Sequence, residues 1–216
     1  MKGNKKEIQT KDKSISYTHI ETGSKTICFL FSGSGYNYDK PLFYYSTMVM
    51  LENKMDVVHV HYSYEGSWWD KPIEEMSTRM MEDIQPVITE VLQSNSYSEI
   101  IFLGKSLGTI PIAIHLMEKE EFVDATMILL TPLLQFDSIF DSILNSKHKG
   151  ILVIGDKDPI FNSNQIEQLN NSKIEIEIIR NANHSLDIGK YETTNSIVAL
   201  STVMEKLNVA VASKTF

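Results

Sequence analysis

The chain has 216 residues, 42% of them hydrophobic, so it can bury a sizeable core, and its length suggests a single domain. Its 28 acidic and 20 basic residues give a formal net charge of −8 and are scattered without a long run of one sign, which argues against nucleic acid as a partner. The single cysteine, Cys28, excludes an intrachain disulfide and fits a reducing compartment.

No feature of the sequence indicates export or a membrane. The lysines of residues 1–14 are not followed by an apolar signal segment, and no apolar run approaches the ~18 residues of a membrane span. We therefore expect a cytoplasmic protein that neither enters a membrane nor binds one.

Short apolar runs rich in β-branched residues alternate with longer segments of helical character, which is typical of a mainly parallel sheet with helices on both faces. An additional edge strand, parallel or antiparallel to its neighbour, is expected at 15–22. Residues 1–13 and 211–216 are expected to be loosely ordered tails. The predicted strands are 27–32, 57–62, 100–104, 125–131, 150–154 and 174–179, and the predicted helices are 42–53, 73–95, 107–119, 164–170 and 191–207.

The segment EIIFLGKSLGTIPIAIHLMEKE (99–120) reads as strand, sharp turn and helix. Its turn, from Gly104 to Gly108, matches the pattern G-x-S-x-G. Such a turn projects the serine hydroxyl above the sheet, and the glycines let strand and helix approach closely. A chance match in an ordinary turn is the alternative, but the apolar strand before it and the amphipathic helix after it favour Ser106 as a nucleophile. Lys105 is expected to face solvent.

With this turn the chain resembles the α/β-hydrolase family, in which an acid and then a histidine follow the nucleophile along the chain. The apolar strand GILVIG runs into DKDPIF, and the resemblance implies that Asp158, the carboxylate before proline, is the acid; Asp156 is the alternative. In NANHSL, His184 follows the last strand, where the family's catalytic histidine lies. The resemblance thus implies a small, uncapped, single-domain α/β hydrolase with the triad Ser106, Asp158 and His184.

The remaining histidines have structural interpretations. His59 and His61 lie in a predicted strand and His115 in a predicted helix, whereas His148 is expected in a surface loop. Asp187 is interpreted as a cap of the following helix.

The resemblance also implies an oxyanion hole made of backbone N–H groups. Leu107 follows the nucleophile and is one donor, and Ser34 in the loop FSGSG is the second. Ser32 stands where the family commonly has histidine, and the hole can survive this change because its donors are main-chain groups. A glycine-rich turn without a ligand is the alternative, and the loop lacks the lysine of a phosphate-binding loop.

Aromatic residues gather after two of the predicted strands, where they either line an acyl or alcohol pocket or attach the loops to the core. The two interpretations carry similar weight. The residues are Tyr36, Tyr38, Phe43, Tyr44 and Tyr45 in one group and Tyr62, Tyr64, Trp68 and Trp69 in the other. Segment 131–149 has room for one helix at most, so we expect an open site that favours small substrates.

These features predict hydrolysis of a small carboxylic ester or related acyl compound through an acyl-serine intermediate, without a metal or organic cofactor. An acyl thioesterase, a dienelactone-hydrolase-like enzyme or a peptidase would use the same residues. From another class, a non-catalytic binding protein that retained the fold is the alternative. A flavodoxin-like nucleotide-binding domain would explain the alternation of strands and helices but not the three motifs together. The sequence leaves the substrate and the oligomeric state open.

Overall fold

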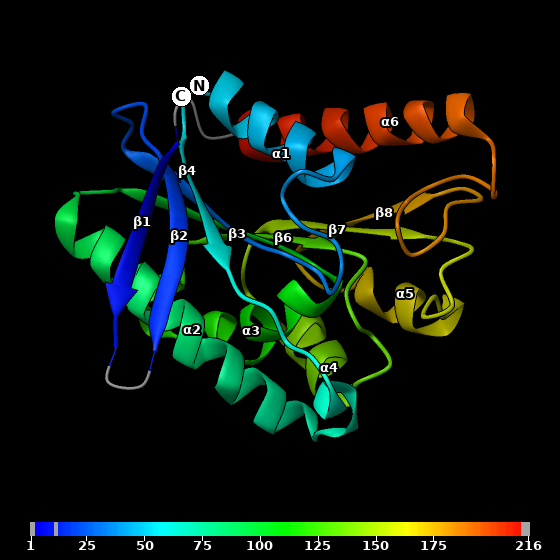
Figure 1. The fold of residues 1–216 in the computed structure, drawn as a ribbon. Coiled ribbons are helices and arrows are strands. Elements are labelled where there is room, and N and C mark those ends of the chain that lie inside the picture. The colour runs from blue at the N-terminus through cyan, green and yellow to red at the C-terminus, as the bar shows by residue number, and fades with distance from the viewer. Residues whose placement is uncertain (1–2, 11–12, 213–216) are drawn as a thin grey trace.

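In a computed structural model of the protein, which describes residues 3–10 and 13–212, the strands form one eight-stranded sheet (Figure 1). Its strand order is β1-β2-β4-β3-β5-β6-β7-β8. Strands β3 to β8 run parallel to one another, whereas β1 and β2 are antiparallel to their neighbours. The strands are β1 (Asn4–Gln9), β2 (Ser14–Ile20), β3 (Thr26–Phe31), β4 (Asp56–His61), β5 (Glu99–Lys105), β6 (Thr126–Leu130), β7 (Gly150–Gly155) and β8 (Ile174–Ile179).

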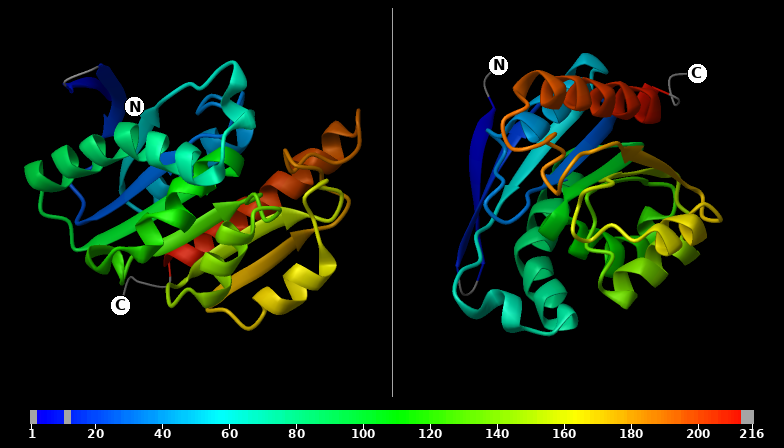
Figure 2. Two further views of the ribbon diagram at one scale, coloured as in Figure 1. Left: turned by 90° about the horizontal axis from the view of Figure 1, so that it is seen from below. Right: turned by 90° about the vertical axis from the view of Figure 1, so that its right-hand side faces the viewer.

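Helices cover both faces of the sheet. Helices α1 (Pro41–Glu52) and α6 (Thr193–Ala212) lie side by side on one face. The other face carries α2 (Ile73–Ser94), α3 (Thr109–Ile114), α4 (Asp137–Asn145) and α5 (Ser163–Leu169), as the views in Figure 2 also show. Among the described residues, no helix is both long and apolar enough to cross a membrane.

The two faces of the central strands supply two separate hydrophobic cores. Because side chains alternate along a strand, Phe29 and Phe31 of β3 pack with α2 and α3, whereas Cys28 and Leu30 pack with α1 and α6. All four side chains are fully buried. This double burial explains why the runs in the central strands are apolar at every position.

The predicted fold class is confirmed, and each of the six main strands lies within one residue of its expected bounds. The helix expected at 107–119 is shorter than predicted. Helix α3 ends at Ile114, because His115 leaves the helical conformation (φ −123°, ψ −51°) and a 3₁₀ turn follows.

The prediction of a loose tail over 1–13 is wrong for residues 4–9, which form β1 and pair with β2. For this reason β2 is not the edge strand. Strand β1 is polar, and only Ile8 packs against the core, so its sequence has no apolar alternation to reveal it. At the other end α6 extends to Ala212, and Val211 is buried; residues 213–216 lie outside the described residues.

Segment 131–149 contains one helix, as expected. Helix α4 packs against α3 and α5, and its apolar residues Ile139, Phe140 and Ile143 are buried. It therefore belongs to the helical layer and does not form a lid.

Candidate active site

The turn after β5 holds Ser106 in a strained conformation. Its φ is +51°, a left-handed value that non-glycine residues rarely adopt and that costs about 1–3 kcal/mol. The flanking glycines make the turn possible, because a Cβ on Gly104 would stand 2.3 Å from the Gly108 carbonyl oxygen. Thr109 donates a 2.7 Å hydrogen bond from its hydroxyl to the Ser106 carbonyl oxygen, which helps to hold the turn. Strain of this kind, maintained by surrounding contacts, points to a functional role.

The three residues proposed as a triad lie together. Nε2 of His184 is 2.8 Å from Oγ of Ser106, and Nδ1 of the same ring is 2.7 Å from Oδ2 of Asp158. The Asp158 side chain is fully buried, whereas that of His184 is 32% exposed. The serine is placed by the end of β5, the aspartate by the end of β7 and the histidine by the loop after β8. This arrangement can remove a proton from the serine and stabilise the imidazolium that results.

Asp156, the alternative acid, has a different partner. Its Oδ1 accepts a 2.6 Å hydrogen bond from the backbone N–H of Asn181, so it holds the start of the loop that carries His184. Asp187 lies in the same loop and donates its backbone N–H to the Asn183 side chain. It does not begin α6, so its expected role as a helix cap is wrong.

The glycine-rich loop after β3 lies beside the nucleophile. A Cβ on Gly33 would be 3.5 Å from Cβ of Ser106, so the backbone of this loop closely approaches the turn. A hollow of about 60 Å³ is lined by Ser34 and Leu107, the two predicted backbone donors, together with Gly33, Gly35 and residues 62–64. The hollow is therefore suitably placed for an oxyanion and a short substituent.

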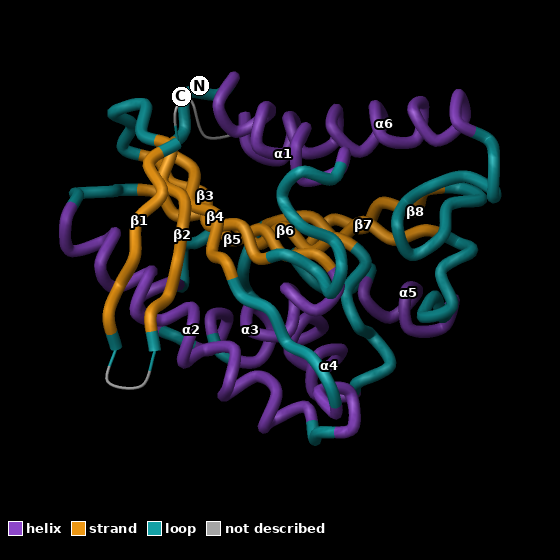
Figure 3. Tube along the Cα trace, in the orientation of Figure 1, coloured by secondary structure: helices purple, strands orange, loops and turns teal. Residues whose placement is uncertain are grey.

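Two further hollows adjoin the site. A cleft of about 690 Å³ shares Ser63 and Tyr64 with the small hollow and continues between α2 and the connection that leads into it from β4. The loop that leaves β4 is drawn in teal in Figure 3. A hollow of about 190 Å³ is lined by Tyr36, by Ser185 next to His184, and by apolar residues of α6 such as Ile197. Open space therefore lies next to the small hollow and, separately, next to the residue that follows His184.

The expectation that Lys105 faces solvent is wrong. The residue is only 2% exposed, and its Nζ donates to the His184 carbonyl oxygen at 3.1 Å and lies 3.4 Å from Oγ1 of Thr131. The same Nζ is 4.7 Å from the centre of the Tyr36 ring. Burial lowers the pKa of Lys105 to about 8, whereas the carboxylates of Asp158 and Asp187 raise it. The polar partners of this lysine are distant in sequence, so no local pattern indicated its burial.

The other histidines lie outside the triad. His148, expected at the surface, is 5% exposed, so that prediction is wrong. Its Nε2 donates to the Phe122 carbonyl oxygen at 3.0 Å, and its Nδ1 is 3.0 Å from Oγ of Ser146. His59, His61 and His115 each contact a threonine or serine hydroxyl through Nε2, at 2.9, 2.8 and 2.9 Å.

Several of the loop aromatic residues attach loops to the core. The Tyr38 hydroxyl is 2.7 Å from the carbonyl oxygens of both Leu30 and Val60, and the residue is 9% exposed. Tyr62 donates to the Ser32 carbonyl oxygen at 2.8 Å. Tyr62 and Tyr64 also line the small hollow, so these two residues both attach a loop to the core and form part of a pocket wall. In contrast, Tyr44, Tyr45 and Trp69 are about half exposed.

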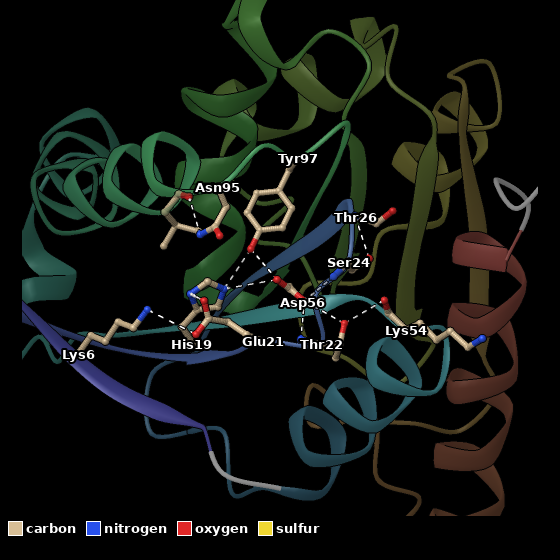
Figure 4. Close-up of polar contacts among 11 residues, drawn as sticks. Lys6, His19, Glu21, Thr22, Ser24, Thr26, Lys54, Asp56, Asn95 and Tyr97 are labelled. Atoms are coloured by element: carbon tan, nitrogen blue, oxygen red, sulfur yellow. Dashed lines mark hydrogen bonds and ion pairs between the residues drawn. The ribbon is translucent and has the colours of Figure 1, made fainter.

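A second buried polar cluster lies at the opposite edge of the sheet (Figure 4). Asp56 begins β4, and its carboxylate accepts hydrogen bonds from the Tyr97 hydroxyl at 2.6 Å and the Thr22 N–H at 2.7 Å. His19, 1% exposed, is 3.2 Å from the Tyr97 hydroxyl through Nε2. Because Asp56 begins β4 and the triad lies at the carboxyl ends of the strands, this cluster is separate from the candidate active site. The described residues contain no group of three or more acidic, histidine or cysteine side chains that could hold a metal ion.

Comparisons with known proteins agree with this architecture. Solved structures of similar fold include an α/β serine hydrolase homologue from Coxiella burnetii (TM-score 0.73, 15% identity, 98% of each chain covered). Others are an esterase from Pyrococcus furiosus (TM-score 0.67, 15% identity, 96% of this chain and 92% of that chain) and a dienelactone hydrolase from Anabaena variabilis (TM-score 0.66, 17% identity, 95% and 96%). At these identities the likeness shows the fold alone.

A search of curated proteins found no significant match. A family model described as an α/β-hydrolase domain matches residues 24–212, which include the turn at Ser106, Asp158 and His184. The chain therefore belongs to the α/β-hydrolase family.

Proposed function

We propose that the protein is a serine hydrolase that cleaves a small carboxylic ester, or a related acyl compound, through an acyl-serine intermediate. The observation that carries this proposal is the continuous chain of contacts from Ser106 Oγ through the His184 ring to the buried Asp158 carboxylate. A binding protein would not need a strained serine joined to a histidine and a carboxylate in this order.

Acylation begins when Oγ of Ser106 attacks the carbonyl carbon of the substrate and His184 Nε2 takes the hydroxyl proton. Asp158 holds the ring through Nδ1 and stabilises the imidazolium. The tetrahedral intermediate collapses as the C–O bond to the leaving group breaks, and the imidazolium returns the proton to the departing oxygen. Water then attacks the acyl-serine with His184 again as base, which releases the acid and restores the serine.

The backbone N–H groups of Leu107 and Ser34 are the proposed donors to the oxyanion. Each such donor is worth about 3–4 kcal/mol in the transition state. Their common position at a hollow of about 60 Å³ supports this assignment and favours a short acyl group. The remainder of the substrate would extend into the neighbouring cleft of about 690 Å³.

The choice of an ester rests on this small hollow and on the esterase among the proteins of similar fold. Thioester, dienelactone and peptide substrates remain the alternatives within the same chemistry. The small-molecule acyl substrate is part of this proposal, and a cytoplasmic location stays a prediction of the sequence.

Intact-protein mass spectrometry after treatment with a fluorophosphonate tests the nucleophile. We expect one adduct on the wild type and none on Ser106→Ala. Ser34→Ala is the matched control: it removes an exposed hydroxyl from the oxyanion loop but keeps the backbone donor, so it should still form the adduct.

A wild type that forms no adduct, and that hydrolyses no member of a panel of nitrophenyl acetate, nitrophenyl butyrate and an acetyl thioester, would favour the binding-protein alternative. Turnover of the thioester in clear preference to the esters would change the substrate class and keep the mechanism.

A further inference from the structure

Lys105 is a buried cation that the proposed mechanism does not use. It directly precedes the nucleophile, ends β5 and is only 2% exposed. Burying an ammonium group is unfavourable unless it is well paired, because the charge loses its hydration. No carboxylate lies within 4 Å of its Nζ among the ion pairs of the described residues, so no close salt bridge offsets this loss.

The contacts of Lys105 join several parts of the site. Its backbone belongs to the strand that leads into Ser106, while Nζ donates to the carbonyl oxygen of His184 at 3.1 Å. Nζ also lies 3.4 Å from Oγ1 of Thr131, at the end of β6, and faces the ring of Tyr36 in the loop after β3. One side chain therefore connects the strand of the nucleophile to the loop of the base.

The surroundings of the ammonium also matter electrostatically. The charged groups around it are the carboxylates of Asp158, after β7, and Asp187, in the loop after β8, and both favour its protonated form. The Tyr36 ring faces it from the loop after β3, and its contact with His184 is to the backbone carbonyl oxygen of that residue. Burial lowers the pKa of Lys105 to about 8, so the group is still predominantly cationic at neutral pH.

We propose that Lys105 is a positioning residue that holds the His184 loop against the nucleophile turn through its hydrogen bond to the His184 carbonyl oxygen. This inference rests on the proposed function, because a general base acts only when it lies within hydrogen-bond reach of the serine hydroxyl. A hydrogen bond from an ionised donor is stronger than one between neutral groups, so a charged Lys105 is suited to fixing this loop.

Two variants separate this role from a purely structural one. Lys105→Met keeps much of the length of the side chain but removes the charge and the donor. Lys157→Met is the matched control, because it removes an exposed positive charge adjacent to Asp158 in the chain. If Lys105→Met does not fold, Lys105→Gln removes the same charge and keeps a polar group.

The first readout is the order of the His184 loop, followed at one pH by NMR of nitrogen-labelled protein, with the His184 signals assigned by comparison with His184→Gln. We expect the backbone and ring signals of His184 to move and broaden in the Lys105 variant and to stay unchanged in Lys157→Met. Signals that are the same in all three proteins would overturn the proposal. This readout needs no substrate, so it is independent of the proposed function.

The second readout is the separate measurement of kcat and KM for the ester that the wild type hydrolyses. In Lys105→Met, kcat should fall on the order of tenfold with KM little changed, because the His184 loop is no longer held in place. An unchanged kcat would overturn the proposal. If the Lys105 variant shows the NMR change but the wild type shows neither fluorophosphonate adduct nor turnover, the proposed function is contradicted and the contact of Lys105 with the His184 loop stands.

Discussion

Gly108 lies so close to Phe31 that a Cβ on the glycine would stand 2.0 Å from the Phe31 carbonyl oxygen. Phe31 ends β3, which leads into the oxyanion loop, and Gly108 ends the turn that contains Ser106. The contact therefore sets the spacing between the nucleophile and the loop with the second proposed donor. An added methyl group would have to push two backbone segments apart.

We expect Gly108→Ala to lower the free energy of unfolding by about 3 kcal/mol, since a clash with backbone cannot be relieved by a rotamer change. The melting temperature should fall by roughly 6–12 °C. The control is Gly23→Ala, where φ is +80° but nothing lies within 4 Å, so only the left-handed conformation opposes the change, at about 1 kcal/mol. Equal effects in the two variants would contradict the steric argument.

Asp158 contacts the His184 ring, whereas Asp156 contacts the Asn181 N–H, so replacing Asp158 should lower activity far more than replacing Asp156. Asp158→Asn puts an amide next to the His184 ring and disfavours the required tautomer, so kcat should fall roughly 10,000-fold. Asp156→Asn keeps an oxygen for the Asn181 N–H and should change kcat by no more than about threefold. The rate of fluorophosphonate labelling gives the same comparison without a substrate. The reverse order of effects would reassign the acid to Asp156.

The Tyr38 hydroxyl should stabilise the fold around the oxyanion loop. It contacts the carbonyl oxygen of Leu30, in the strand that leads into this loop, and that of Val60. We expect Tyr38→Phe to lower the free energy of unfolding by about 1–2 kcal/mol, as measured by urea unfolding. It should also lower kcat several-fold without raising KM. Tyr45→Phe, at a position 48% exposed, should change neither quantity, and a similar loss there would refute the tethering role.

His59 should make the fold less stable in acid. Burial, with His61 adding to it, lowers the pKa of His59 to about 4, whereas an unfolded chain has about 6.5. Between these values the unfolded state binds more protons, so stability falls as the pH drops from about 6.5 to 4, by roughly 3 kcal/mol. Urea unfolding at pH 7 and at pH 4 gives the stability lost on acidification. This loss should be roughly 3 kcal/mol smaller for His59→Gln than for the wild type. An identical pH dependence in both proteins would disprove this.

Asp56 should likewise make the protein less stable in acid, but at lower pH than His59. Burial alone would raise its pKa, but hydrogen bonds from Tyr97, Thr22 and Ser24 outweigh burial and hold the pKa below its usual range. Its contribution is therefore present above about pH 4 and is lost as the pH falls through the lowered pKa. At pH 7 we expect Asp56→Asn to lower the free energy of unfolding by about 2 kcal/mol. The exposed Asp70→Asn should change it by less than about 0.5 kcal/mol.

The main strands and the turn at Ser106 could be predicted because their signals are local. An apolar run has to be covered on both faces, and glycines on either side of a serine permit the close approach of strand and helix. Strand β1 could not be predicted in this way. Its polar residues are held by pairing with β2, and Ile8 alone packs against the core.

By itself the sequence determined the order of strands and helices, the strained turn, and the chain order of serine, acid and histidine. The tertiary structure alone decided that Asp158 and not Asp156 faces His184. It alone placed Lys105 inside the protein, against the His184 loop. The physical reason is that strand and turn preferences come from neighbouring residues, whereas the burial and partners of a charged side chain depend on segments brought together only when the sheet assembles.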